Sequence, residues 1–350
     1  MQDFENSQSI KLKTLDSDLK NTIFGQDHAI DAVVDMLTIN TVGLGDDNKP
    51  IASFLFTGPT GVGKTELVIS LAKSLGMHFE RFDMSEYADD YSYRNLIGAQ
   101  KGLVGYDEGG LLTNAISENP STVLLLDEIE KGHPSVYDTF LQVLDYATLK
   151  DSAGQAVSFK ETIIIMTSNL DGKTTRGIGF GNGSSSKENS EELSLFLRPE
   201  FRNRIDKILH FNTLSNTMIV SVVEKFVCDL KARLVKKRID LTVSELALDH
   251  LIKLGFDQGM GARSVKRAIN DEFKKHIAKE MLFGTLSNGG KVTVDVIDGV
   301  FSYDFKEKKC DFKTADEAMA YAKKNPGVVI GRFTNGAGYS IKGKDNHDVN

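Results

Sequence analysis

The chain has 350 residues, of which 40% are apolar and 26% charged, and its formal net charge is −7. This composition is typical of a globular protein with two or three domains, and the acidic balance argues against a general nucleic-acid binder, which needs a basic surface. No apolar run approaches the roughly 18 residues of a membrane span, and the polar start lacks the apolar core of a signal peptide. We therefore expect neither a nucleic-acid nor a membrane partner.

The two cysteines, Cys228 and Cys310, lie far apart in the sequence. Neither has a second Cys or a His at metal-ligand spacing, so a metal site of this kind is not expected. A lone disulfide stays open as an alternative, but reduced thiols and a cytoplasmic location are the expectation.

The first part of the chain alternates helical and strand-like patterns. After the polar stretch 1–22, apolar residues at helical spacing predict a helix over 27–41. Further helices are predicted over 65–76 and 133–149. Short apolar runs predict strands over 52–58, 78–84, 122–128 and 161–169. This alternation predicts an α/β domain with a parallel sheet, extending over 23–212.

After residue 212 the pattern becomes mostly helical. Three amphipathic helices are predicted over 216–238, 244–255 and 262–282, followed by a hairpin within 291–305. Together they predict a smaller α-helical (α+β) domain over 213–305. The extension 306–350 contains a helical pattern and an Asn335-Gly336 hairpin signal, but no motif that indicates a role.

The stretch "GPTGVGKT" fits the phosphate-binding pattern G-x-x-x-x-G-K-[ST]. Its residues are Gly58, Pro59, Thr60, Gly61, Val62, Gly63, Lys64 and Thr65. Glycines let backbone N–H groups turn toward phosphates, and the helix that follows adds its positive end. Lys64 is expected to neutralise the β- and γ-phosphates, and the Thr65 hydroxyl to ligate Mg²⁺. A chance Gly-rich turn is the alternative, which the preceding strand and following helix disfavour.

Two further segments place polar side chains at the ends of buried strands. Asp127 and Glu128 end "LLLDE", and Asn169 ends "IIIMTSN". The carboxyl ends of parallel strands face the ligand crevice. We expect Asp127 to hold Mg²⁺, Glu128 to orient or deprotonate the attacking water, and Asn169 to hold that water. An ordinary turn is the alternative for Asn169.

Several motifs together resemble one family. "IFGQDHAID", "FLFTGPTGVGKTE", "RFDMSEY", "LLLDEIEK", "FRNRID" and "MGARSVKR" occur in this order. Over about 15–305 the chain resembles the second, C-terminal ATPase module of the ClpA/ClpB-type AAA+ proteins, the ClpA type being the nearer. The resemblance implies homo-hexameric rings that use ATP to pull protein substrates through a central pore.

The resemblance also implies roles for individual residues. Arg204 matches an arginine finger that reaches the nucleotide of the neighbouring subunit, with Arg202 assisting. Asn169 and Arg263 match the two sensors, and Ile23 and Phe24 match the stretch beside the adenine. Fixed cations stabilise the charge of a phosphoryl-transfer transition state. A surface salt bridge is the alternative for Arg204, and a charge at a helix start is the alternative for Arg263.

The pore loop departs from the family pattern. Its glycine-aromatic-valine-glycine sequence corresponds here to Gly102, Leu103, Val104 and Gly105. Leucine keeps apolar bulk but lacks the stiff, flat surface of an aromatic ring, so we expect a weaker or differently selective grip on the substrate chain.

The chain also begins with Met1 and shows only the second module. Both an excised piece and a naturally short, single-ring protein stay open.

One tripeptide bears on the choice of partner. Ile178, Gly179 and Phe180 lie in a Gly/Ser-rich stretch before the arginine-finger segment. The resemblance implies that this is the loop with which ClpA-type proteins dock on a ClpP-like peptidase, and which ClpB lacks. Three functions stay open: an unfoldase feeding a peptidase, a ClpB-type disaggregase, and a non-processive protein that modulates a peptidase or a host ring. A helicase is disfavoured by the acidic balance.

Overall fold

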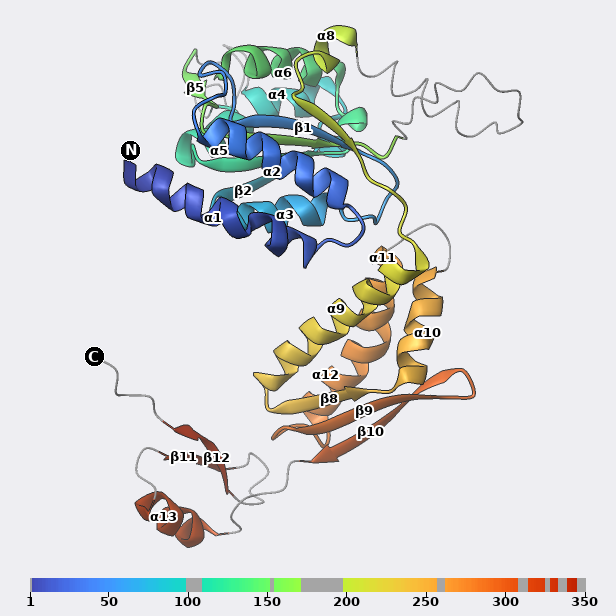
Figure 1. Cartoon of the computed structure of the whole chain (residues 1–350). Helices are drawn as coiled ribbons and strands as arrows, with labels where there is room; N and C mark the ends of the chain where they lie inside the picture. Colours follow the sequence, from blue (N-terminus) through green and yellow to red (C-terminus); the bar gives the residue numbers. More distant parts are fainter. Residues whose placement is uncertain are drawn as a thin grey trace. The chain divides into compact units, whose positions relative to one another are not determined.

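The computed structural model describes most of the chain as two compact units, residues 1–215 and 216–350 (Figure 1). The described residues are 2–98, 109–151, 154–170, 198–256, 262–307, 314–324, 328–332 and 339–344. The four-part division predicted above, with boundaries at 22, 212 and 305, stays a prediction. Of the helices in these ranges, none is long and apolar enough to cross a membrane.

The first unit is built on a five-stranded sheet, and every neighbouring pair in it is parallel. The strand order is β2 (His78–Asp83), β3 (Thr122–Asp127), β6 (Ile163–Thr167), β1 (Ala52–Thr57) and β7 (Lys207–His210). The predicted α/β class is thus confirmed. β7 was not predicted, because its four residues, "KILH", carry too short an apolar pattern to identify a strand.

Helices cover both faces of this sheet. One face packs against α1 (Gln2–Lys20), α2 (Asp27–Thr41) and α3 (Lys64–Leu75), and the other against α4 (Asp90–Ile97), α5 (Leu111–Glu118) and α6 (Pro134–Tyr146). Successive side chains of a strand point to opposite faces. Phe54 and Phe56 therefore enter one core while Leu55 enters the other. Coverage on both faces explains why β1, β3 and β6 are buried throughout.

The helix predicted over 133–149 ends early. α6 stops at Tyr146 because Ala147 adopts a left-handed conformation, with φ at 47°. The chain then forms a small antiparallel pair, β4 (Thr148–Lys150) with β5 (Ala156–Ser158). The short helix α8 (Pro199–Arg202) follows much later and precedes β7.

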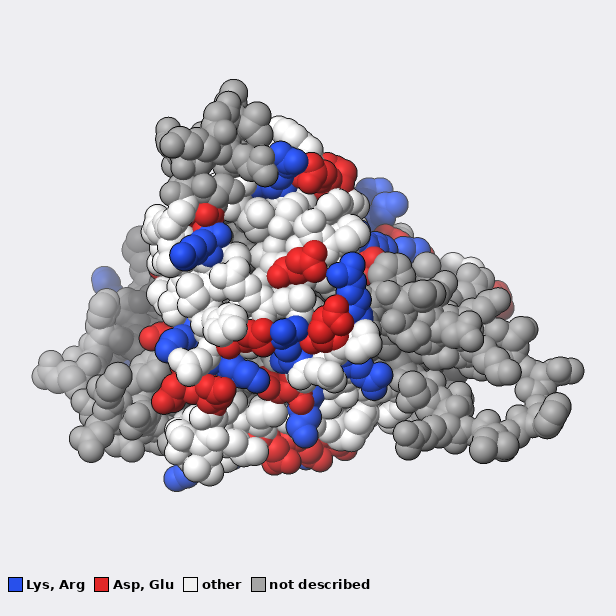
Figure 2. All heavy atoms as spheres, turned by 90° about the horizontal axis from the view of Figure 1, so that it is seen from above, with Lys and Arg blue, Asp and Glu red and all other residues white. Residues whose placement is uncertain are grey.

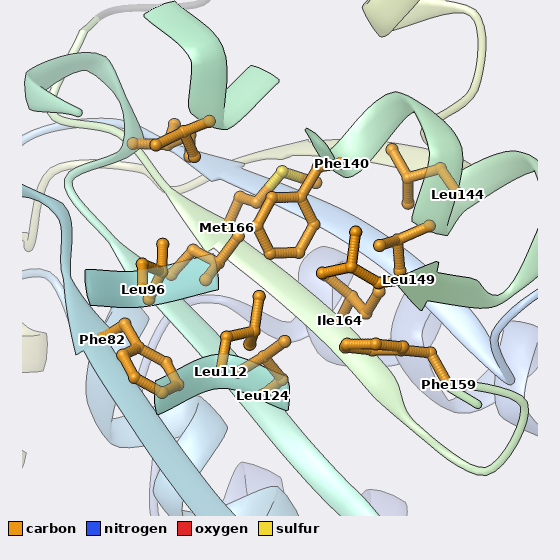
Figure 3. Close-up of a cluster of buried hydrophobic side chains, with 14 of the residues drawn as sticks. Phe82, Leu96, Leu112, Leu124, Phe140, Leu144, Leu149, Phe159, Ile164 and Met166 are labelled. Atoms are coloured by element: carbon orange, nitrogen blue, oxygen red, sulfur yellow. The ribbon is translucent and has the colours of Figure 1, made fainter. Parts of the chain in front are cut away.

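Phe140 lies at the centre of the core between α6 and the sheet. It is fully buried beside Met166 of β6, in a cluster that also contains Leu96 of α4 (Figure 3). We expect Phe140→Ala to lower the free energy of unfolding by about 3–5 kcal/mol, because it removes a buried ring and leaves a cavity. Tyr146→Ala, on the exposed part of the same helix, is the matched control. Equal denaturation midpoints for the two variants would contradict this assignment of the core.

The second unit combines helices with a three-stranded sheet. The helices are α9 (Asn216–Val235), α10 (Glu245–Phe256), α11 (Ala262–Ala268) and α12 (Lys275–Phe283). The strands are β8 (Ile239–Val243), β9 (Gly290–Ile297) and β10 (Val300–Glu307), in the order β10-β9-β8. The antiparallel hairpin β9–β10 confirms the prediction, whereas β8, which pairs parallel with β9, was not predicted. The single helix predicted over 262–282 is interrupted by a π-helical turn at Ile269–Lys274.

The extension contains α13 (Ala315–Lys324) and an antiparallel pair, β11 (Val328–Arg332) with β12 (Tyr339–Lys344). This pairing is the one that the Asn335-Gly336 signal predicted, although those two residues lie outside the described ranges.

Candidate nucleotide-binding site

Three adjacent strands of the parallel sheet bring the predicted site residues to one edge. β6 lies between β1 and β3. The Gly-rich loop follows β1, Asp127 ends β3, and Asn169 lies two residues beyond β6. Because all three strands run in the same direction, these segments leave the sheet at its carboxyl edge, where ligands of α/β proteins bind.

The Gly-rich loop depends on glycine at defined positions. Gly58, Gly61 and Gly63 have φ values of 127°, 76° and 108°, which side chains rarely permit. A Cβ on Gly58 would also lie 2.4 Å from the carbonyl oxygen of Phe211. Gly63 is the N-cap of α3, so the amino end of this 12-residue helix adjoins the loop.

Lys64 lies buried within the loop, with 7% of its surface exposed. Its ammonium group donates to the carbonyl oxygen of Gly58, to that of Pro59 at 2.9 Å, and to Asn169 Oδ1 at 3.0 Å. Thr65, half-buried, is the next residue of α3. The amine of the loop is thereby joined to the end of β6, over 105 residues of sequence.

Asn169 connects the loop to Glu128. Its amide nitrogen Nδ2 donates to Glu128 Oε1 at 2.8 Å while its Oδ1 accepts from Lys64, and its backbone N–H donates to Glu130 Oε1 at 3.0 Å. The structure therefore brings together Lys64, Glu128 and Asn169, three of the residues predicted to act on the nucleotide. An ordinary turn would not require this side chain to bridge a cation and a carboxylate.

Glu128 is held in an unusual backbone conformation, with φ at 55°. Its N–H donates to Thr167 Oγ1 of β6 at 3.0 Å. Its Oε2 pairs with Lys131 Nζ, three residues along the chain. The bond from Lys131, with that from Asn169 second, lowers the pKa of Glu128 below its ordinary value against the opposing effect of burial. The carboxyl is therefore ionised at neutral pH.

Asp127 is almost fully buried, and both of its oxygens have partners. Oδ1 accepts from Thr167 Oγ1. Oδ2 lies 2.8 Å from Nη2 of Arg81, which also lies 3.2 Å from Asp83 Oδ2. Neither Arg81 nor Lys131 was identified from the sequence. Both lie in or beside strand ends that carry carboxylates, and this proximity in sequence could have suggested ion pairs. Which groups pair, however, depends on the register of the strands.

The stretch before α2 lies against the loop. Ile23 is buried, and its Cγ2 lies 3.4 Å from where a Cβ on Gly63 would be, whereas Phe24 is half-buried. Gln26, which was not identified from the sequence, is fully buried. Its Nε2 donates to Asn212 O at 2.9 Å and its Oε1 accepts from Asn212 N at 3.0 Å, so it joins this stretch to the segment after β7.

Arg204 follows α8 and pairs within its own chain. Its Nε lies 2.6 Å from Asp145 Oδ2 of α6, and its Nη1 donates to Glu200 O at 3.2 Å. Arg202 is exposed. The segment is anchored by Asp206, whose Oδ2 accepts from both the N–H and the hydroxyl of Ser53. The salt bridge that was the alternative for Arg204 is therefore present, and its finger role stays a prediction.

The other predicted residues lie in the second unit or outside the described ranges. Arg263 is an exposed residue near the start of α11, in the second unit. The pore-loop residues Gly102, Leu103, Val104 and Gly105 and the docking residues Ile178, Gly179 and Phe180 lie outside the described ranges.

Comparisons with known proteins agree with this architecture. Residues 49–208 match the family model described as "AAA domain (Cdc48 subfamily)", and residues 214–294 match the "C-terminal, D2-small domain, of ClpB protein". The chain is 44% identical over 298 residues to the ClpA homolog protein of Fuscovulum blasticum, covering 85% of this chain and 38% of the relative.

Two other relatives match over similar shares of this chain and of their own length. The ATP-dependent Clp protease ATP-binding subunit ClpE of Streptococcus pneumoniae is 46% identical over 77% of this chain and 37% of its own length. Chaperone protein ClpB 2 of Nostoc sp. is 43% identical over 83% of this chain and 34% of its own length. The chain thus spans little more than a third of the length of these relatives. The fold, the joined site residues and these matches show that the chain belongs to the AAA+ ATPases of the Clp/Hsp100 family, in which it corresponds to the C-terminal ATPase module.

Proposed function

We propose that this chain is an ATP-driven protein unfoldase and translocase, which assembles as a homo-hexamer and delivers substrates to a ClpP-like peptidase. The observation that carries the ATPase part is the Asn169 amide, which lies between the Lys64 ammonium and the Glu128 carboxylate. The peptidase part rests on the sequence Ile178-Gly179-Phe180 between β6 and α8. The acidic net charge supports a protein rather than a nucleic-acid substrate. In Figure 2, basic and acidic side chains are interspersed on the face in view.

The proposed roles in hydrolysis follow from the contacts. Backbone N–H groups of the loop 58–63, in which only Pro59 lacks one, bind the phosphates. Lys64 exchanges its carbonyl partners for phosphate oxygens, which are stronger acceptors for a cation. Glu128, ionised and held by Asn169 and Lys131, orients the attacking water and accepts its proton.

The donor set fits Mg²⁺. Within the described ranges no three His, Cys, Asp or Glu side chains are grouped to hold a metal ion. Mg²⁺ commonly takes one or two carboxylates together with phosphate oxygens and water, and Asp127 with the Thr65 hydroxyl supplies such donors. When bound, Mg²⁺ neutralises charge on the β- and γ-phosphates.

The other residues complete the nucleotide site. Ile23 and Phe24 supply apolar contact for the adenine, beside the loop that holds the phosphates. Arg263 supplies a cation from the second unit. Arg204 reaches the γ-phosphate of the neighbouring subunit, so hydrolysis depends on ring assembly.

The peptidase interaction follows from simple energetics. Each buried apolar tip contributes roughly 1.5–3 kcal/mol, which is weak for a single loop. Several loops on one ring bind far more strongly, because the first contact raises the effective concentration of the rest. Ile178 and Phe180 are the proposed tips.

Degradation of a tagged, folded reporter by this chain with a ClpP-type peptidase and ATP tests the proposal. Loss of the reporter that requires ATP and both proteins is the expected result. A reporter that stays intact while aggregates are recovered without peptidase favours the second candidate, a ClpB-type disaggregase, which the 43% identity to a ClpB chaperone supports. ATP hydrolysis that unfolded proteins do not stimulate favours the non-processive modulator, which Leu103 supports.

Ile178→Asp combined with Phe180→Ser is expected to abolish association with the peptidase, because a charge and a hydroxyl replace the two apolar tips. ATP hydrolysis should stay within two-fold of the unaltered chain, a margin of about 0.4 kcal/mol. Ser184→Asp with Ser186→Ala adds a charge to the same stretch and is the matched control. Co-sedimentation of the first variant with the peptidase would overturn the docking assignment.

A further inference from the structure

Asp127 forms an ion pair with Arg81, a residue to which no role has been assigned above. The Asp127 side chain is only 9% exposed, and its Oδ1 accepts from Thr167 Oγ1. A buried carboxylate needs an opposite charge or several hydrogen-bond donors to offset its lost hydration. Arg81 of β2 supplies that charge, with Nη2 at 2.8 Å from Oδ2.

Arg81 shares one nitrogen between two carboxylates. The same Nη2 lies 3.2 Å from Asp83 Oδ2. Asp83 is paired with Asp127 across the β2–β3 register, and Arg81 lies two residues earlier on the same face of β2. The Arg81 side chain is 46% exposed, whereas Asp127 is buried and bonded to β6. Arg81 can therefore move toward Asp83, and Asp127 cannot follow it.

The Arg81 guanidinium already occupies the Oδ2 oxygen of Asp127, which a metal ion would also use. A metal ion held by Asp127 has to use Oδ2 or share Oδ1 with Thr167. A guanidinium and a divalent ion at one carboxylate repel each other, and the repulsion is largest where water is excluded. We propose that Arg81 is a resident counter-ion of Asp127 that competes with Mg²⁺ for this carboxylate, and so sets the Mg²⁺ concentration that nucleotide binding requires. This inference rests on the proposed nucleotide site.

The test is a titration of Mg²⁺ at a fixed concentration of fluorescent ADP, with the full chain and no hydrolysis. For Arg81→Met we expect the half-saturating Mg²⁺ concentration to fall by about three- to ten-fold, because the competing cation is gone. In EDTA without nucleotide, the same variant should denature at a lower temperature than the unaltered chain, since Asp127 has lost its counter-charge.

Asp83→Asn should act in the opposite direction. It removes the second charge on Arg81, so Arg81 is held by Asp127 alone and the required Mg²⁺ concentration should rise. Its amide oxygen can still accept from Ser85, as Asp83 Oδ1 does. Arg94→Met, which breaks a pair with Asp90 on α4 at 2.7 Å, is the matched control and should leave the titration unchanged.

Equal Mg²⁺ requirements in the Arg81→Met, Asp83→Asn and Arg94→Met variants would overturn the inference and leave the nucleotide site standing. A higher requirement in Arg81→Met would also overturn it, because Arg81 would then assist the metal. If Arg81→Met does not fold, Arg81→Gln, which also removes the charge but keeps a hydrogen-bond donor, and Asp83→Asn must still shift the titration in opposite directions. Failure of the unaltered chain to bind the nucleotide with Mg²⁺ would reject the proposed function itself.

Discussion

Glu128→Gln is expected to lower the ATP turnover number by about 10²–10⁴-fold, the range for loss of a positioned general base, while nucleotide binding persists. The amide keeps the shape of the side chain, and its oxygen can still accept from Asn169 Nδ2, as Glu128 Oε1 does at 2.8 Å. It cannot accept a proton from water, and it gives up the charge that pairs with Lys131. The phosphate-binding loop is untouched, so ATP should bind and remain intact.

Steady-state hydrolysis and binding of fluorescent ADP, measured on the same preparation, separate these two effects. Glu118→Gln, the same chemical change at the exposed end of α5, controls for the loss of one negative charge. Turnover within a factor of two of the unaltered chain in Glu128→Gln, a difference of about 0.4 kcal/mol, would reject Glu128 as the group that acts on water.

The parts of this site that were predictable from sequence are those in which local geometry determines the structure. Residues 58–63 form a loop between a buried strand and a helix. Glycine is required at Gly58, Gly61 and Gly63 because their φ values are positive, and at Gly58 also because the backbone of Phe211 leaves no room for a Cβ. The position of Asn169 was predictable from a general rule, since the carboxyl ends of parallel strands share one edge. Its bonds to Lys64 and Glu128 require β6 to lie between β1 and β3.

The parts that were missed depend on packing between segments that are distant or weakly patterned. Arg81 reads as an ordinary strand residue until the β2–β3 register places Asp83 against Asp127. β7 and β8 have four and five residues, and neither has the continuous apolar run by which β6, also of five residues, was identified. The π-helical turn within 262–282 leaves the apolar spacing nearly unchanged, so a helical pattern cannot reveal it.

Arg204→Ala is expected to lower ATP turnover by about 10³–10⁵-fold, the range found for loss of an arginine finger. The structure supplies a matched control, because within one chain Arg204 pairs with Asp145. This pair is partly exposed, so breaking it should change stability little. Asp145→Asn breaks the same salt bridge and keeps the arginine. If Arg204 acts only through that salt bridge, the two variants must have the same ATP turnover number. The arginine-finger role requires the turnover number of Arg204→Ala to be far lower than that of Asp145→Asn.

Mixing two inactive variants then distinguishes action across a subunit boundary from action within one chain. Arg204→Ala subunits retain Glu128, and Glu128→Gln subunits retain Arg204. In a head-to-tail ring mixed in equal amounts, roughly a quarter of the interfaces combine an intact Glu128 with an intact Arg204 from the neighbour. We therefore expect the mixture to hydrolyse ATP although each variant alone does not. If Arg204 served the nucleotide of its own chain, every subunit would lack one of the two groups, and the mixture would stay inactive.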